Sequence, residues 1–358
     1  MKKKLSQVLP SIHTNKAWRK KIRTLFFFTA ISLFAITSFA LLSIPTGNNN
    51  SFNLKKIVAV NSNHNILIQA EEPDKREVKL LFVGDIMLAR SLGVSILNGN
   101  NPFVNVKSFF SNYDIVIGNL ETTIARSFVG VQASKGFTFK APPKAAEILK
   151  DAGIDIVSLA NNHSMDYGDD ALYETMNYLN SSGVGHFGAG VDVAQAYMPF
   201  YIQFKDTKIS ILGLNNVERW IADVNQFQGG SAYFDETLVR KALKDAQDNS
   251  DIVIVMPHWG DEYTSLVNSE QKTWGKFFID NGADLVIGGH THSIQANEIY
   301  NDKTIIYSLG NFVFDGMTGI PGATQGKMIE VKISNNKIDN TKDYLVNIGF
   351  DGFPTLAE

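Results

Sequence analysis

The sequence predicts an α/β domain that begins near residue 78 and occupies the rest of the chain. The 358 residues are 44% hydrophobic and 19% charged, a composition typical of a globular protein with a sizeable core. From residue 78 onward, short apolar runs alternate with amphipathic helical stretches, which is typical of βα units with a largely parallel sheet. We find no repeat of fixed period, which argues against solenoids and arrays.

The predicted elements follow one another in a regular order along this domain. The apolar runs of strand length are 78–83, 115–117, 154–159, 209–212, 252–255, 285–287 and 305–309. The predicted helices are 143–151, 169–181, 235–248 and 270–281. Several of them begin at Asp or Pro and end near Gly or Asn, as helices prefer. Residues 203–212 differ, because Asp206 and Thr207 are predicted to turn a hairpin.

The N-terminal region carries the features of a membrane anchor. Eight of the 33 Lys and Arg residues lie in the first 23 positions, which contain no acid. Residues 25–44 follow without a charge, and about twenty such residues cross a hydrocarbon core of ~30 Å as a helix. The basic residues predict a cytoplasmic N-terminus and an extracytoplasmic C-terminal domain. A cleaved signal peptide with Ser38-Phe39-Ala40 is the alternative, although the apolar stretch is longer than an ordinary h-region.

These features divide the chain into four parts. They are a cytoplasmic basic tail at 1–24, a transmembrane anchor at 25–44, an extracytoplasmic stalk at 45–77 and a globular domain at 78–358. The stalk prediction rests on its asparagines and on apolar runs that are short, such as 57–60. We therefore expect a single-pass protein of the cell membrane.

Charge and cysteine content limit the ligands of the domain. After the first 23 residues the chain carries 25 basic and 36 acidic side chains, an acidic excess that argues against nucleic-acid binding. The chain has no cysteine, so it has neither disulfides nor thiolate ligands. A transition metal must be held by His, Asn and carboxylates, and an anionic polymer or a phosphoester could then bind through the metal.

Polar clusters follow six of the predicted strands. They lie at 83–85, 117–121, 159–163, 255–258, 287–292 and 309–311. Because ligand sites in open α/β sheets form past the carboxyl ends of strands, we expect these distant segments to meet at one rim. Their oxygen and nitrogen atoms suit one or two divalent ions of Mn, Fe or Zn.

Six side chains in these clusters are candidate metal ligands. They are Asp85, Glu121, Asn162, His258, His290 and His292. The last two form the sharpest pair, because alternate residues of an extended chain point to the same side and the preceding glycines allow close backbone approach. A di-metal centre also needs carboxylates to bridge and neutralise its cations.

Most of these candidates also have a structural interpretation that the sequence leaves open. His290 and His292 could be solvated loop residues, Asp85 could cap a turn, and Glu121 could lie on a solvated loop. Asn162 could serve only a tight turn. The metal interpretation is favoured because the polar clusters repeat at six strand ends.

Two histidines have specific alternatives. His258 could pack against Trp259 and hydrogen-bond to Asp261 or Glu262. If His258 binds metal instead, these two acids would orient its ring. His163 is the candidate general acid for a leaving oxygen. Its alternative is a simple hydrogen bond to Asp166.

The clusters together resemble the bacterial capsule-synthesis CapA family, also called PgsA, of poly-γ-glutamate biosynthesis, which is related to calcineurin-like metallophosphatases. The resemblance spans residues 78–315. Its matching segments are FVGDIMLAR at 82–90, GNLET at 118–122, SLANNHSMDYG at 158–168, HWGDEY at 258–263, GGHTHS at 288–293 and YSLGNFVFD at 307–315. The resemblance implies two central mixed sheets flanked by helices.

The resemblance also implies roles for residues that depart from the metallophosphatase pattern. Met87 stands in place of a ligand histidine, and Glu121 in place of a bridging aspartate. Ser164 replaces a carboxylate beside His163, so Asp166 would orient that histidine. The candidates for orienting ligands or contacting substrate are Asn119, Asn161, Asp261, Glu262, Asn311 and Asp315.

Three functions are compatible with these residues. The first is a metal-dependent hydrolase of phosphoesters or related linkages. The second is a non-catalytic accessory subunit that holds or exports an anionic polymer beside membrane synthase subunits. The third is that the polar residues at the strand ends have only a structural role. The presence of six polar clusters makes this interpretation the least favoured. The resemblance places biosynthesis or export of a capsule or exopolymer first and leaves catalysis open.

Overall fold

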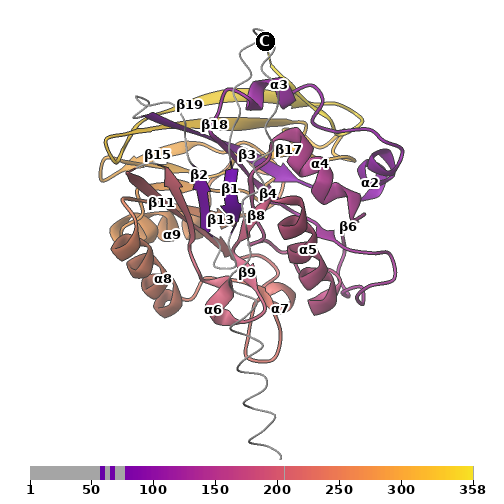
Figure 1. Ribbon diagram of the computed structural model, residues 1–358, viewed down its shortest axis with the longest axis horizontal. Helices are drawn as coiled ribbons and strands as arrows, with labels where there is room; N and C mark the ends of the chain where they lie inside the picture. Colours follow the sequence, from indigo (N-terminus) through magenta and orange to yellow (C-terminus); the bar gives the residue numbers. More distant parts are fainter. Residues whose placement is uncertain (1–56, 61–64, 69–76, 205, 358) are drawn as a thin grey trace, which may run out of the picture. The chain divides into compact units, whose positions relative to one another are not determined.

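Two mixed β-sheets lie at the centre of the domain, with helices on the outer faces (Figure 1). The computed structural model describes residues 57–60, 65–68, 77–204 and 206–357. The predicted basic tail at 1–24 and anchor at 25–44 lie outside these residues. Within the described part, none of the helices combines the length and the apolar character needed to span a membrane.

The first sheet has the strand order β20, β19, β18, β3, β4, β7 and β8, with β17 beside β3. Its parallel strands are β17 (Asn311–Val313), β3 (Glu77–Ile86), β4 (Ile115–Leu120), β7 (Ile156–Ser158) and β8 (Gly185–Phe187). Its antiparallel strands are β18 (Gln325–Ser334), β19 (Lys337–Ile348) and β20 (Pro354–Leu356). The sequence pattern did not predict this antiparallel C-terminal part.

The second sheet has the order β1, β2, β10, β11, β13, β14, β16 and β15. Its parallel centre is β11 (Thr207–Asn215), β13 (Ile252–His258), β14 (Leu285–Ile287) and β16 (Lys303–Ile306). On its two sides lie β10 (Phe200–Phe204) and β15 (Asn297–Tyr300), each antiparallel to its neighbour in this centre. The predicted hairpin turn is confirmed, because Phe204 pairs with Thr207 across it.

Part of the segment expected to be a stalk belongs to this second sheet. Residues Ile57–Val60 form β1 and residues Asn65–Ile68 form β2, two antiparallel strands within the predicted stalk at 45–77. β2 pairs in parallel with β10. Each of these two apolar runs therefore forms a four-residue strand at the edge of the second sheet.

Helices cover the outer face of each sheet (Figure 1). The first sheet is covered by α2 (Arg90–Leu97), α3 (Lys107–Phe110), α4 (Lys144–Ala152) and α5 (Gly168–Ser182). The second is covered by α8 (Glu236–Asn249) and α9 (Ser269–Asp280). Short elements complete the domain: α6 (Val193–Ala196), α7 (Arg219–Ala222), β5 (Thr123–Ile124), β6 (Lys140–Ala141), β9 (Ala189–Gly190) and β12 (Gly230–Ser231).

The four predicted helices are confirmed to within one residue at each end. Their ends carry the expected signals. The side chains of Asp235 and Asn268 accept backbone hydrogen bonds at the start of α8 and α9. Gly153 and Gly183 end α4 and α5 in the left-handed region, which glycine adopts without steric cost.

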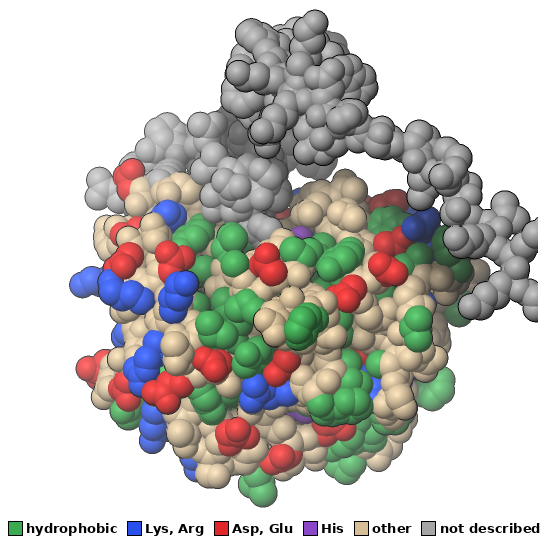
Figure 2. Space-filling view, turned by 90° about the horizontal axis from the view of Figure 1, so that it is seen from below, with side chains coloured by type: hydrophobic (Ala, Val, Ile, Leu, Met, Phe, Trp, Pro, Cys, Tyr) green, Lys and Arg blue, Asp and Glu red, His purple; other side chains and the backbone are tan. Residues whose placement is uncertain are grey.

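Buried apolar layers hold these elements together. The middle layer lies between the sheets and includes Phe82 and Ile117 from the first and Ile254 from the second. The neighbouring residues Leu81 and Val83 face the outer layer under the helices. Both faces of β3 are therefore buried, which explains its continuous apolar run. On the outer surface drawn in Figure 2, hydrophobic side chains lie in separate groups among acidic and basic ones.

Substitution of Gly84 tests the close packing of β3 against the segment that contains Gly310. A Cβ atom at Gly84 would lie 2.1 Å from the carbonyl oxygen of Gly310, a backbone atom that cannot swing away. We expect Gly84→Ala to lower the free energy of unfolding by roughly 1–3 kcal/mol, the usual range for overpacking. Gly136→Ala is the matched control, because a Cβ there meets nothing within 4 Å. Equal denaturant midpoints for the two variants would contradict this packing.

Candidate metal centre

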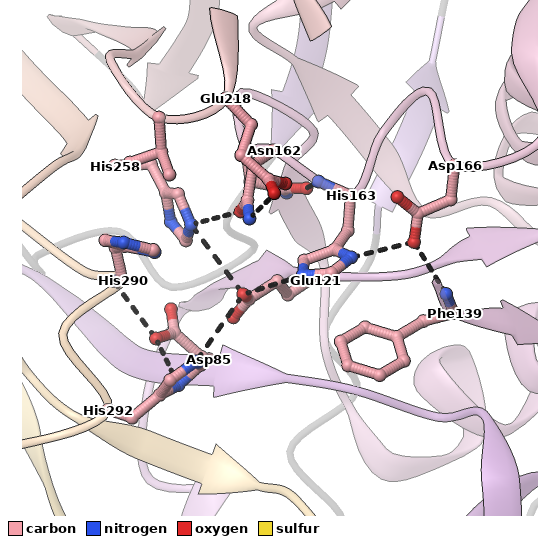
Figure 3. A network of polar contacts seen from close by, with 12 residues as sticks. Asp85, Glu121, Phe139, Asn162, His163, Asp166, Glu218, His258, His290 and His292 are labelled. Carbon is pink, nitrogen blue, oxygen red and sulfur yellow. Dashed lines mark hydrogen bonds and ion pairs between the residues drawn. The ribbon is translucent and has the colours of Figure 1, made fainter. Parts of the chain in front are cut away.

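The six predicted ligands meet in one buried cluster between the carboxyl ends of strands from both sheets (Figure 3). The first sheet supplies three of them. Asp85 lies on β3, Glu121 directly follows β4, and Asn162 lies in the turn after β7. The second sheet supplies His258 at the end of β13 and His290 and His292 after β14. None of the six is more than 3% exposed. The solvated-loop interpretation is therefore wrong for Glu121, His290 and His292.

Two groups of side chains in the cluster could each hold a metal ion, and both include Glu121. One consists of Glu121, His258 and His290, and the other of Asp85, Glu121 and His292, with the donor atoms of each within 4.8 Å of one another. Asn162 extends the first group, because its Oδ1 lies 3.0 Å from Nε2 of His258. One group thus offers four donors and the other three.

Glu121 is a buried carboxylate that lacks a hydrogen-bond partner within the described part of the chain. The side chain is fully buried, and neither of its oxygens accepts a hydrogen bond from a described residue. Imidazole nitrogens of His163, His258 and His292 lie 3.7, 3.7 and 3.9 Å from its Oε1. Burial, and next the Asp85 carboxylate, raise the pKa of Glu121 well above its usual range. Since an unpaired buried carboxylate is costly, the donor set fits a bound cation.

The three histidines of the cluster are held in the form that binds metal. Burial lowers the pKa of His258 and His290 well below the usual range and lowers that of His292 to about 4. Neutral imidazole has a lone pair for a metal, whereas the protonated ring has none. Nδ1 of His290 has no hydrogen-bond partner among the described residues. These rings are therefore ready to act as ligands.

Asparagines fix the orientation of the candidate ligands. The amide of Asn119 donates to Oδ1 of Asp85 at 2.8 Å and lies 3.2 Å from Nδ1 of His258. Asn161 donates to Oδ1 of Asn119 at 3.0 Å. Oδ1 of Asn311 lies 2.8 Å from Nδ1 of His292, so that ring presents Nε2 to the cluster. Such outer partners set the tautomer and direction of metal-binding groups.

His163 lies at the edge of the cluster with one nitrogen directed toward it. Its Nδ1 is 2.7 Å from Oδ2 of Asp166, and its Nε2 is 3.7 Å from Glu121. Asp166 also accepts a hydrogen bond from the backbone nitrogen of Phe139, whose ring stacks on His163 at 4.2 Å (Figure 3). Asp166 is thus placed to orient His163, while Ser164 bonds to the Asn161 carbonyl.

Several candidates lie outside the ligand cluster. Asp261 is exposed and accepts a hydrogen bond from Asn268. Glu262 is also exposed. The His258 ring lies within hydrogen-bond distance of Asn119 and Asn162, and not of Asp261 or Glu262. Asp315 is buried but pairs with Arg90. Met87 packs in the apolar core, where its sulfur accepts a hydrogen bond from Ala89, so it adds no donor to the cluster.

Two charged residues beside the cluster were missed by the sequence analysis. Nζ of Lys135 lies 2.7 Å from Asp166, from Glu218 and from the Asn162 carbonyl, and its side chain is 1% exposed. Oε2 of Glu218 accepts a hydrogen bond from the Asn162 amide at 3.1 Å. Lys135 and Glu218 therefore hold both Asn162 and Asp166 in place. They belong to irregular segments where neither periodicity nor a strand end marks them.

Backbone strain is concentrated around the cluster. Nine described non-glycine residues have positive φ, and four of them turn the hairpins at 301–302 and 335–336. The other five are Arg90, Glu218, Tyr263, His290 and His292. Such conformations cost on the order of 1–3 kcal/mol each and are kept where the surrounding structure enforces them, often at functional sites.

The sequence of this chain is similar to those of bacterial capsule synthesis proteins. The family model described as "Bacterial capsule synthesis protein PGA_cap" matches residues 79–316. The chain is 32% identical over 237 residues to the PGA biosynthesis protein CapA of Bacillus subtilis, covering 65% of this chain and 62% of that protein. It is 29% identical over 252 residues to the capsule biosynthesis protein CapA of Bacillus anthracis, covering 68% and 61%. The chain thus spans about three fifths of the length of these relatives.

A solved structure is similar in fold. The crystal structure of a hypothetical protein from Thermus thermophilus superposes with a TM-score of 0.50 at 16% identity. The match covers 75% of this chain and 98% of that chain. At this identity the likeness concerns the arrangement of strands and helices alone.

Removal of the Lys135 charge tests the buried network beside the cluster. We expect Lys135→Met to lower the free energy of unfolding by roughly 3–5 kcal/mol, because it leaves the buried Asp166 carboxylate without its cation. Lys144→Met is the matched control, since the Lys144–Glu147 pair is more than half exposed and should contribute under about 1 kcal/mol. Similar losses for both variants in denaturant unfolding would show that Lys135 is not a buried counter-charge.

Proposed function

Because the chain belongs to the PGA_cap family of bacterial capsule synthesis proteins, we propose that it acts in the biosynthesis or export of a capsule or exopolymer through a site for two divalent cations. A polymer such as poly-γ-glutamate fits the names of its relatives. The proposed place of action is the outer side of the cell membrane, with residues 25–44 as the anchor. Membrane synthase subunits are the proposed partners.

The unpaired carboxylate of Glu121 carries the metal part of the proposal. Asp85, Glu121 and Asp166 are fully buried acids, and Lys135 is the only buried cation among the described residues that contact them. Lys135 is also shared with Glu218. A cluster with this excess of negative charge is stable only if cations enter it or protons neutralise it. Its His, Asn and carboxylate donors suit Mn, Fe or Zn.

Each residue of the cluster would have a defined task. Glu121 would bridge two cations, one completed by Asn162, His258 and His290 and the other by Asp85 and His292. Divalent cations in such a site act as Lewis acids on a phosphoryl or acyl oxygen. His163 would donate a proton from Nε2 to a leaving oxygen when its ring is doubly protonated, since Asp166 already holds Nδ1.

The second candidate function is a non-catalytic accessory role. One ligand group has only three donors among the described residues, because Met87 is turned into the core. A site with one weakly held cation could bind an anionic polymer without cleaving a bond. Metal binding without turnover in the assays below would favour this role over a hydrolase.

Elemental analysis of the full-length protein after incubation with manganese or zinc tests the metal site. We expect one to two ions per chain in the wild type. Glu121→Gln should lower metal affinity at least tenfold, because it removes the shared ligand. It should also raise the stability of the metal-free protein at neutral pH, since it removes a carboxyl group whose pKa is raised by burial in the folded state.

Glu330→Gln is the matched control for this experiment. Glu330 is also a buried acid, but its carboxylate accepts hydrogen bonds from Tyr113 and Tyr344. This variant should keep its metal and lose stability. A wild-type protein that takes up no metal, or a Glu121→Gln protein that keeps wild-type affinity, would refute the proposed site.

Hydrolysis of diphenyl phosphate by the manganese-loaded protein tests the catalytic part, because its phenolate leaving group is basic enough to benefit from a proton donor. If the protein is a hydrolase, His163→Ala should lower kcat by about 10²–10⁴, the usual contribution of a general acid, while its metal content stays unchanged. His186→Ala controls for loss of a buried histidine that lies on β8, away from the six ligands. Equal rates for His163→Ala and the wild type would remove His163 from the mechanism.

A further inference from the structure

We propose that Arg90, with Tyr263 as a wall, forms an anion-binding subsite beside the metal centre that takes an oxyanion group of the substrate, a phosphate or a carboxylate. The inference rests on the proposed function, because the same substrate would reach the cations and this subsite together. It extends that function, because it implies that the substrate carries a negatively charged group that is bound by Arg90 directly.

The guanidinium of Arg90 is separated from two histidines of the site by single aromatic rings. Its central carbon lies 4.9 Å from the ring centre of Phe139 and 5.5 Å from that of Phe314. The Phe139 ring stacks on His163 at 4.2 Å, and the Phe314 ring lies 4.9 Å from the His292 ring. Arg90 is thus within reach of a substrate whose reacting group lies between these histidines.

Asp315 fixes one edge of the guanidinium and leaves the other available. Nη2 of Arg90 lies 2.5 Å from Oδ1 of Asp315 and donates to the Asp315 carbonyl at 2.7 Å. No described residue accepts a hydrogen bond from Nε or Nη1, and the Arg90 side chain is 36% exposed. A guanidinium held on one edge and open on the other is prepared for a phosphate or carboxylate.

Tyr263 supplies a wall of the subsite on the loop after β13. Its ring stacks on His292 at 5.6 Å and is 40% exposed, while its backbone nitrogen donates to the Thr291 carbonyl at 2.8 Å. An exposed aromatic ring that covers a candidate ligand is placed to exclude water from an anion bound to Arg90.

Both residues have a positive φ, which is uncommon for residues other than glycine. Arg90 is the first residue of α2 but has φ of 51°, and Tyr263 has φ of 59°. Helical residues normally have φ near −63°, so the first position of a helix gives no reason for this value.

Charge makes Arg90 the suitable partner for an anion. The side chain of Lys135 is 1% exposed and already contacts two carboxylates, so it has no capacity for a ligand. The partly exposed acids Glu218 and Glu262 would repel an anion. Among the charged residues described around the cluster, Arg90 combines exposure with positive charge. It would counter this repulsion and set the direction in which an anionic substrate binds.

The test is calorimetric titration of inorganic phosphate, and separately of glutarate, into the manganese-loaded full-length protein. We expect Arg90→Met to weaken binding of at least one probe about tenfold or more, as for loss of a charge-assisted pair. Arg90→Lys should give an intermediate loss, because it keeps the charge but not the fork. The probe that is affected identifies phosphate or carboxylate as the bound group.

Two controls make the result specific. Arg126→Met removes an arginine that pairs with Glu174 on the surface and should leave both affinities unchanged. Glutaramide, the uncharged counterpart of glutarate, should bind no differently to the wild type and to Arg90→Met. Metal content and melting temperature are measured for every variant.

Several outcomes would overturn the inference. If Arg90→Met keeps its manganese and binds both probes like the wild type, the subsite is absent although the metal proposal stands. The same follows if the metal-loaded wild type binds neither probe. If Arg90→Met fails to fold, Arg90→Lys decides, since it can retain the pair with Asp315, and wild-type affinity in that variant refutes the subsite. A wild type without metal removes both proposals.

Discussion

The buried carboxylate of Glu121 is the constraint on which the rest of the site depends. It lies between two sheets, receives no hydrogen bond from the residues that the structure describes and has Asp85 as a charged neighbour. A fold keeps such a group only if something positive compensates for it during function. Both groups of possible metal ligands include Glu121, so one side chain would link the two proposed coordination sites. The proposed function follows from that sharing.

The fold places donors from both sheets around this carboxylate at a cost in backbone strain. Gly288 and Gly289 allow the chain after β14 to pass Tyr307 and Asp85, since a Cβ there would lie 2.1 Å from a carbonyl oxygen and 2.8 Å from the Asp85 carboxylate. His290 and His292 then take left-handed conformations to face Glu121. Lys135 and Glu218, which lie on two other loops, hydrogen-bond to Asn162 and hold it in place. The supporting residues are thus as specific as the ligands.

The sequence predicted the part of this structure that has a periodic or positional signal. Apolar runs located most of the parallel strands but not β8 or β17, and polar residues after the predicted strands gave the six candidate ligands that now lie together. The antiparallel strands β18 and β19 were not predicted, because charged residues interrupt the apolar run of β18 and one face of β19 is largely exposed and polar. β1 and β2 lie where the sequence predicts a stalk, because a four-residue apolar run has the same pattern in a linker and in an edge strand.

Lys135, Glu218 and the pairing of Arg90 with the candidate Asp315 were beyond sequence reasoning for a different reason. Their roles depend on contacts between segments from 27 to 225 positions apart, and neither loop position nor charge distinguishes them from solvated residues. Asp261 illustrates the converse, since it follows His258 closely in sequence yet bonds to Asn268 on the surface. A residue that lies close in sequence to a candidate ligand is therefore not necessarily close to the cluster when it follows the end of the strand.

Anomalous diffraction from crystals grown with manganese tests the central claim most directly. The account predicts two anomalous peaks, each about 2.0–2.2 Å from a different oxygen of the Glu121 carboxylate. One peak should also contact Asn162, His258 and His290, and the other Asp85 and His292. Crystals with no peak at Glu121, or with manganese bound only elsewhere on the molecule, would contradict it.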